Sequence, residues 1–231
     1  MTPLATVVQS SHGLATTVAW ALPGHVRYAL EGNITNTGGA VEWVAALLGL
    51  SAAEDAAALA ASVPDAGGVY VVPAFAGLGA PHWDAGAKGL VCGLTRGASR
   101  AQVARAAIEA IAYQIRDVFE AMRQDAAMPL PALYADGGAS RNDVLMQFQA
   151  DILDCPVIRS SLPDISAMGA AWLAGLAIGY WASQEELQSL PRPTTRFEPS
   201  MSESRRMELT SGWTDALARS RTTLTRSRMT S

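Results

Sequence analysis

The stretch Leu133-Tyr-Ala-Asp-Gly-Gly-Ala-Ser-Arg-Asn142 decides how the rest of the chain is organised. Residues 132–135 are mostly apolar and typical of a buried strand, and residues 141–154 have the pattern of a helix. Gly137 and Gly138 between them allow a tight turn, and they let a ligand approach the backbone without meeting a Cβ atom. Ser140 is predicted to cap the helix that follows.

This order predicts a strand, a glycine turn and an open helix N-terminus. The backbone N–H groups of such a turn suit an anion or a nucleotide. Ligands of open α/β sheets also gather at the carboxyl ends of strands. A strand-to-helix turn that binds nothing has the same sequence pattern. The local sequence alone therefore allows both a ligand-binding turn and a purely structural one.

The composition indicates one large or two small globular domains. The chain has 231 residues, of which 49% are hydrophobic and 16% charged, so it can bury a substantial core. Its net charge of -4 gives no electrostatic case for a nucleic-acid partner. Cys92 and Cys155 are expected to be buried thiols rather than a disulfide. The three histidines lack ligand spacing, so no metal site is predicted.

Nothing in the sequence points to a membrane or to secretion. The N-terminus has no basic segment followed by an apolar one, so no signal peptide is expected. The most apolar run, residues 167–181, is shorter than the roughly 20 residues that a membrane-spanning helix needs. The chain is therefore expected to be soluble and cytoplasmic.

Upstream of the glycine turn, the sequence predicts a β-hairpin and then helices and short strands. β-Branched residues 14–20, a turn at Pro23-Gly24 and alternating residues 26–30 indicate the hairpin. Ser99 and Gln102 form a capping box for the longest helix. The other elements expected are a short strand at 5–8, helices at 38–48 and 52–61, and strands at 69–72 and 89–94.

Downstream, a strand at 156–159 is expected to pair in parallel with residues 132–135. A helix capped by Ser166 should run to Tyr180, and its small residues predict close packing on a sheet. The elements that follow are a helix at 184–190, a linker at 191–199, a surface helix at 201–217 and a disordered tail at 219–231. Strands and helices alternate, which predicts an α/β fold with helices on both faces of a mixed sheet.

Several motifs, in order along the chain, resemble the FGGY carbohydrate kinases, and within that family the glycerol kinases. The resemblance covers residues 13–213. The family's second signature is similar to Gly89-Leu-Val-Cys-Gly-Leu94 with Gln102-Val103 and Ala106-Ala-Ile-Glu109. Other matching motifs are Tyr28-Ala-Leu-Glu-Gly32, residues 69–84, Gly93-Leu-Thr-Arg-Gly97, Asp136-Gly-Gly138, Leu145-Met-Gln-Phe-Gln149 and Gly169-Ala-Ala171.

The resemblance implies a ribonuclease-H-like lobe of an actin-like ATPase. Residues 1–195 would be the C-terminal, nucleotide-binding lobe, and residues 196–231 a C-terminal helix with its tail. The implied nucleotide contacts are Gly38, Glu42, Gly138 and Asn142, to which the glycine turn adds Gly137. Position 42 departs from the family, which has glutamine there. The implied cofactors are ATP and Mg²⁺.

The resemblance also implies what this chain lacks. The family's phosphate loop, glycerol-binding residues and catalytic aspartate have no counterpart, so no catalytic residue is assigned, and glycerol would bind through a missing N-terminal lobe. The lobe's first strand is also expected to be absent, which leaves the chain inactive alone and marginally stable.

A truncated gene, a partial gene model and an excised domain all remain open. A kinase for another sugar or polyol and a non-enzymatic remnant are the alternatives, and a full-length enzyme could form a homo-oligomer.

Overall fold

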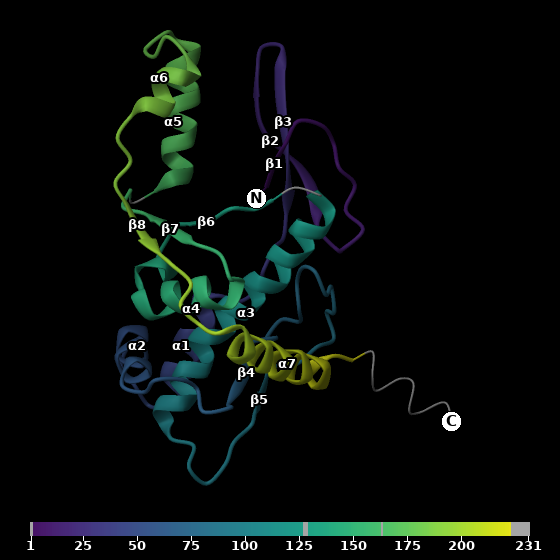
Figure 1. Ribbon diagram of the computed structural model, residues 1–231, viewed down its shortest axis with the longest axis vertical. Coiled ribbons are helices and arrows are strands. Elements are labelled where there is room, and N and C mark those ends of the chain that lie inside the picture. The colour runs from purple at the N-terminus through teal and green to yellow at the C-terminus, as the bar shows by residue number, and fades with distance from the viewer. Residues whose placement is uncertain (1, 127–128, 163, 223–231) are drawn as a thin grey trace, which may run out of the picture.

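A computed structural model describes residues 2–126, 129–162 and 164–222 of the chain (Figure 1). Strands and helices are mixed along the sequence, and the α/β class is confirmed. In chain order the elements are β1 (Thr2–Leu4), β2 (Ala15–Leu22), β3 (His25–Glu31), α1 (Gly38–Leu47), α2 (Ala53–Ala61), β4 (Tyr70–Val72), β5 (Leu90–Cys92), α3 (Arg100–Ala126), β6 (Leu133–Ala135), the 3₁₀ turn η1 (Ala139–Arg141), α4 (Asp143–Leu153), β7 (Val157–Ser160), α5 (Ile165–Ala177), α6 (Gln184–Ser189), β8 (Thr194–Phe197) and α7 (Glu203–Ser220).

The described strands form three small sheets, with orders β1-β3-β2, β4-β5 and β6-β7-β8. The predicted hairpin is confirmed, because β2 and β3 pair antiparallel. The predicted parallel pairing is confirmed as well, with Leu133 opposite Val157 and Ala135 opposite Arg159. The mixed sheet is the β6-β7-β8 sheet alone, and the hairpin lies in a sheet of its own. Within the described part of the chain, no strand joins β6 to that hairpin.

Two short strands differ from the sequence-based expectation. The predicted linker at 191–199 contains β8, which pairs antiparallel with β7 and places Phe197 opposite Val157. The first strand lies at Thr2–Leu4 rather than at residues 5–8, and it pairs with β3. Both strands are too short to show a clear period of hydrophobic residues, so their pairing partners decide their conformation.

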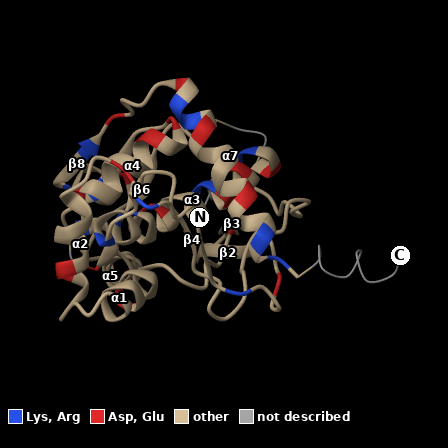
Figure 2. Cartoon of the chain, turned by 90° about the horizontal axis from the view of Figure 1, so that it is seen from below, with Lys and Arg blue, Asp and Glu red and all other residues tan. Residues whose placement is uncertain are grey.

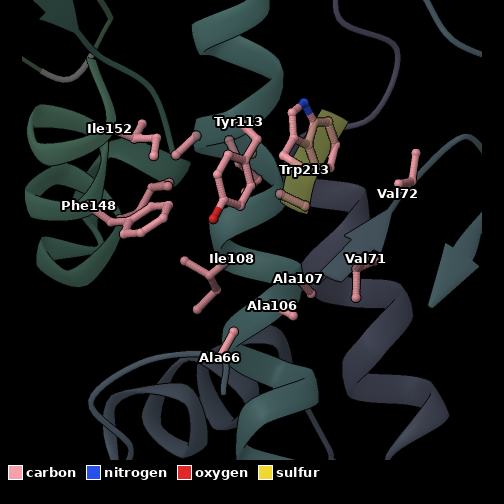
Figure 3. Packing of buried hydrophobic residues seen from close by; sticks show 14 of the residues in the cluster. Ala66, Val71, Val72, Ala106, Ala107, Ile108, Tyr113, Phe148, Ile152 and Trp213 are labelled. Carbon is pink, nitrogen blue, oxygen red and sulfur yellow. The ribbon is translucent and has the colours of Figure 1, made fainter. Parts of the chain in front are cut away.

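The core is built around α3, which contacts α1, α2, α4 and β4. Tyr113 of α3 stacks on Trp213 of α7 at 5.1 Å and meets Phe148 of α4 edge-on at 5.4 Å (Figure 3). Trp213 is 1% exposed, and its Nε1–H donates to Asp117 Oδ2 at 2.9 Å. Leu145, Phe148 and Ile152, which the sequence placed on the core side of α4, are all buried. The core therefore ties the C-terminal helix to the centre of the fold.

The predicted N-terminal cap is partly right for α3 and wrong for α5. At α3 the Gln102 side chain accepts from the Ser99 N–H at 2.7 Å, which is one half of the predicted capping box, and the Ser99 hydroxyl donates to the same Gln102 oxygen instead of accepting from the helix backbone. At α5 the cap is Asp164, whose carboxylate accepts from the Ala167 N–H at 2.9 Å, and Ser166 lies inside the helix. Asp164 and Ser166 both carry side-chain oxygens suited to the cap, and the charged acceptor takes it.

The small-residue helix α5 does not pack closely on a sheet. Among its described residues only Gly175 is buried, and it meets the Trp181 ring. Leu173 is 36% exposed and Ile178, which follows the helix, is 81% exposed. Figure 1 shows α5 and α6 standing away from the body of the molecule. The predicted contact of this helix with a sheet is therefore wrong for the described residues.

The C-terminal helix is longer than predicted. α7 continues to Ser220, and the Thr222 N–H donates to Asp84 Oδ2 at 2.9 Å, so part of the predicted tail is ordered. Residues 223–231 of that tail lie outside the described residues. α7 carries both basic and acidic residues (Figure 2). β8 runs across the division predicted between residues 195 and 196, and that division stays a prediction.

Cys155 is buried and Cys92 is half-buried, and both are free thiols.

None of the described helices is both long and apolar enough to cross a membrane.

Candidate functional site

The glycine turn follows β6 directly. Gly137 has φ +83, a left-handed conformation that glycine adopts without strain. Gly138 instead has ordinary helical angles, φ -59 and ψ -47. A Cβ atom built at position 138 would meet no described atom within 4 Å. Neither backbone strain nor packing within the described chain therefore requires glycine at position 138.

The cap of α4 differs from the prediction. Asn142, not Ser140, caps the helix, because its Oδ1 accepts from the Leu145 N–H at 3.1 Å. Ser140 lies one turn earlier in η1, where its hydroxyl donates to the Gly137 carbonyl at 2.8 Å. The extra 3₁₀ turn moves the start of the helix to Asp143. The Asn142 Nδ2 amide has no hydrogen-bond acceptor among the described residues and remains available to donate.

A groove of about 720 Å³ brings most of the predicted site residues together. Gly138 and Asn142 lie on one wall, and Gly38 and Glu42 of α1 lie on another. These residues are about a hundred positions apart in sequence, and α3 packs against both α1 and α4 to bring their ends together. Gly137 lies outside this groove.

The α1 side of the groove is an uncapped helix end. Thr37 stands at the cap position, but its side chain makes no capping hydrogen bond. Gly38, the first residue of the helix, has space around it, because a Cβ atom there would meet no described atom within 4 Å. The Gly38 N–H and the Asn142 amide have no acceptor among the described residues, so both are available to donate to a ligand.

The groove has an apolar floor and a mostly acidic rim. Ile108 and Ile111 of α3 line the floor, together with Leu145. Carboxylates come from α1, α2 and α4, and Arg141 is the cation among the lining residues. This arrangement suits a flat, weakly polar group with hydroxyl donors better than a phosphate chain, which would meet like charges.

Gly137 lines a neighbouring polar cavity of about 360 Å³ at the ends of β6 and β7. Arg159 forms one side of it and donates to Asp143 Oδ1 at 2.6 Å and to the Ser140 carbonyl at 3.0 Å. Its guanidinium also lies 5.1 Å from the centre of the Phe197 ring. These contacts hold the glycine turn in place relative to β7 and β8.

Two groups of lining residues were not anticipated from the sequence. Ala53, Glu54 and Ala57 place α2 on the groove wall, although an alanine-rich helix carries no sequence signal for a site. Arg141 lies next to the glycine turn, where its charge could have been noticed. It reaches the groove because the 3₁₀ turn projects it there.

Comparison with known proteins gives the family. Residues 1–178 match the model of the FGGY family of carbohydrate kinases, C-terminal domain. Glycerol kinase from Carboxydothermus hydrogenoformans is 51% identical over 93% of this chain and 43% of its own length. Glycerol kinase from Dechloromonas aromatica is 52% identical over 91% of this chain and 42% of its own length. The chain thus spans about two fifths of these relatives.

Solved structures agree with the sequence relatives. Plasmodium falciparum glycerol kinase, crystallised with ADP, has a TM-score of 0.86 at 32% identity over 94% of this chain and 44% of that one. Xylulose kinase from Rhodospirillum rubrum has a TM-score of 0.76 at 29% identity over 94% of this chain and 43% of that one. The chain belongs to the FGGY family of carbohydrate kinases and corresponds to their C-terminal domain.

Proposed function

We propose that this chain is the ATP-binding lobe of a glycerol kinase, which transfers a phosphoryl group from ATP to a hydroxyl of glycerol in the cytoplasm. Glycerol rather than a pentulose is favoured because the relatives at 51–52% identity are glycerol kinases, whereas the xylulose kinase structure is 29% identical. Glycerol and the catalytic base would come from a separate N-terminal lobe. We expect no glycerol phosphorylation from this chain alone, because no base is assigned to it.

The observation that carries the proposal is the pair of unobstructed glycines. Gly38 and Gly138 line one groove, and a Cβ atom at either position would meet no described atom within 4 Å. Glycine there is explained by a ligand that approaches the backbone closely. The apolar floor suits adenine, and the Asn142 amide and the carboxylates of the rim suit its ribose. We therefore place the nucleoside end of ATP in this groove. Gly137 lines the neighbouring polar cavity beside it.

Mg²⁺ is proposed to arrive with the phosphates of ATP. Among the described residues, no group of three or more His, Cys, Asp and Glu side chains could hold a metal ion. Mg²⁺ in kinases is commonly held by substrate phosphates, water and one or two carboxylates, so a dedicated protein cage is not needed.

Replacing Gly138 with valine is expected to raise the Kd for ADP at least tenfold, which corresponds to about 1.4 kcal/mol. The Cβ atom of the new side chain would meet no described atom within 4 Å, so the side chain would occupy space in the groove. Isothermal titration calorimetry with ADP measures the change. Gly169→Val is the matched control, because a Cβ atom at Gly169 would also meet no described atom within 4 Å and Gly169 lies outside the groove. Equal Kd values for the two variants would remove Gly138 from the nucleotide site.

Neutralising Glu42 tests which end of the nucleotide lies beside α1. If Glu42 faces the sugar or base, Glu42→Gln should change the Kd for ADP by no more than about tenfold, roughly 1.4 kcal/mol. A carboxylate near the phosphates would repel them, so its removal would tighten binding far more, and most strongly at low salt. Titrations at two ionic strengths separate the cases. Much tighter binding at low salt would show that the nucleotide is placed in the wrong direction.

A further inference from the structure

The polar cavity beside the glycine turn has a positively charged lining. It has a volume of about 360 Å³, and the turn, β7, the two residues after β7 and β8 line it. Arg141 and Arg159 are its charged lining residues, and within the described part of the chain no aspartate or glutamate lines it. The whole chain carries a net charge of -4, and the adjacent groove has a mostly acidic rim. The cavity therefore concentrates positive charge in an otherwise acidic protein.

Arg159 is held in place and still has donors to spare. Its Nη1 donates to Asp143 Oδ1 at 2.6 Å and to the Ser140 carbonyl at 3.0 Å, and the guanidinium lies 5.1 Å from the centre of the Phe197 ring. The Nε and Nη2 hydrogens have no acceptor among the described residues. These two nitrogens form the fork that binds two oxygens of one phosphate group. Because the side chain is already fixed, binding an anion costs it little conformational entropy.

The other polar side chains of the lining are unpaired. Arg141 is exposed, and its guanidinium has no hydrogen-bond or ion-pair partner in the described chain. Thr195 lies opposite Arg159 in the pairing of β7 with β8, so the two side chains share one face of the sheet. The hydroxyls of Ser161 and Thr195 make no hydrogen bond with described residues. The lining therefore offers both charged and neutral donors to one ligand.

The glycine turn adds main-chain donors. The N–H groups of Gly137 and Gly138 have no acceptor among the described residues. Gly137 is left-handed, with φ +83, and Gly138 is right-handed, with φ -59. A left-handed residue beside a right-handed one turns successive N–H groups into a concave site for an anion. Both glycines line the cavity, so the charged side chains and this concave site belong to the same space.

We propose that this cavity is a phosphate-binding site separate from the nucleotide groove, and that it takes inorganic phosphate or the phosphate group of a small monoester. Arg141 supplies an unpaired positive charge, Arg159 supplies a two-pronged donor, and the hydroxyls reach the remaining oxygens. A volume of about 360 Å³ leaves room for the organic part of a monoester. The inference does not depend on the proposed function, because it concerns a different ligand.

The test titrates the 231-residue chain with inorganic phosphate near neutral pH and at constant ionic strength, followed through backbone amide chemical shifts. We expect saturable shifts at Gly137 and Ser161, with a Kd of about 1 mM or tighter. Methyl phosphate is the second probe. Tighter binding of methyl phosphate would identify a monoester as the ligand, and tighter binding of inorganic phosphate would identify the free ion. No saturable shift at these residues with either probe at about 50 mM would overturn the inference.

Removing the unpaired charge tests the role of Arg141. Arg141→Gln should raise the Kd for phosphate at least about tenfold, which is the usual value of one charge-assisted hydrogen bond. Arg96→Gln is the matched control and should leave the Kd unchanged. Arg96 is also exposed and has no side-chain partner in the described chain, but it lies outside the cavity. The same Kd for both variants would contradict the proposed site.

A comparison at Ser161 changes charge without changing shape. Ser161→Asp adds a carboxylate to the lining and should bind phosphate at least about tenfold more weakly than Ser161→Asn, which is neutral and of the same size. Equal binding by these two variants would also count against the site, because a bound anion must respond to a charge beside it.

A titration with ADP in the presence of phosphate shows whether the two sites are separate. Saturating phosphate should change the Kd for ADP by less than about threefold. A Kd for ADP that rises in proportion to the phosphate concentration would show that the cavity holds the phosphates of the nucleotide itself, and the inference would then be wrong. Phosphate binding without any ADP binding would support the inference and refute the proposed function alone.

Discussion

Trp213→Ala is expected to lower the free energy of unfolding by about 3–5 kcal/mol, the usual cost of removing a buried tryptophan side chain. Trp213 is 1% exposed, stacks on Tyr113 at 5.1 Å and donates to Asp117 at 2.9 Å. Its loss would leave a cavity between α3 and α7 and remove one donor from Asp117, which also accepts from His82 Nε2 at 3.0 Å. Since a whole domain is stable by only about 5–15 kcal/mol, the variant should be at the limit of folding.

Urea unfolding followed by circular dichroism measures this loss. Met207→Ala on the same helix is the matched control, because Met207 is 64% exposed, and it should change stability by less than about 0.5 kcal/mol. A Trp213→Ala variant as stable as this control would show that α7 is not part of the cooperative core.

The second large effect is a loss of stability as the pH rises from about 4.5 to about 7. Glu109 is 2% exposed, and burial raises its pKa from 4.5 to about 7 despite its ion pair with Arg105 Nε at 2.7 Å. The charges that face it from other elements are Asp65 and Arg205. Between pH 4.5 and about 7 the unfolded chain has released this proton and the folded chain still holds it. Stability therefore falls with pH over this range, by roughly 3 kcal/mol at about 1.4 kcal/mol for each pKa unit.

Urea titrations at pH 5, 6, 7 and 8 test this dependence. Glu109→Gln cannot ionise, so its stability should vary less with pH by the same roughly 3 kcal/mol. Glu208→Gln is the control, because Glu208 is on the surface of α7, and its pH profile should match that of the unchanged chain. Identical profiles for all three proteins would show that Glu109 titrates at its ordinary pKa.

The parts of the fold that the sequence predicted correctly depend on local patterns. The hairpin, the Gln102 half of the capping box at Ser99 and the parallel pairing of β6 with β7 follow from β-branched runs, cap chemistry and a glycine turn. The errors came where local candidates compete or where tertiary contact decides. Asn142 rather than Ser140 caps α4, and β8 forms in a proline-flanked segment because β7 offers it an edge. The small residues of α5 predict close packing, but the described chain provides no sheet to receive them.

The candidate site was only partly predictable from residues alone. The glycine turn at Gly138 is visible in the sequence. Its proximity to Gly38 and Glu42 was expected only from the family resemblance. No local pattern could bring α1 and α4 together, because their contact is made through α3. The groove walls from α2 and the position of Arg141 appear only once the helices are packed.

The most direct test of the account is a titration of the 231-residue chain with ADP, followed residue by residue through backbone amide chemical shifts. Binding by the lobe alone can be as weak as about millimolar and still be measured in this way. Saturable shifts are expected that are largest at Gly38, Gly138 and Asn142, and Gly138→Val should need at least about tenfold more ADP to reach the same shifts. Shifts that cluster elsewhere, or none at about 10 mM ADP, would contradict the assignment of this groove to the nucleotide.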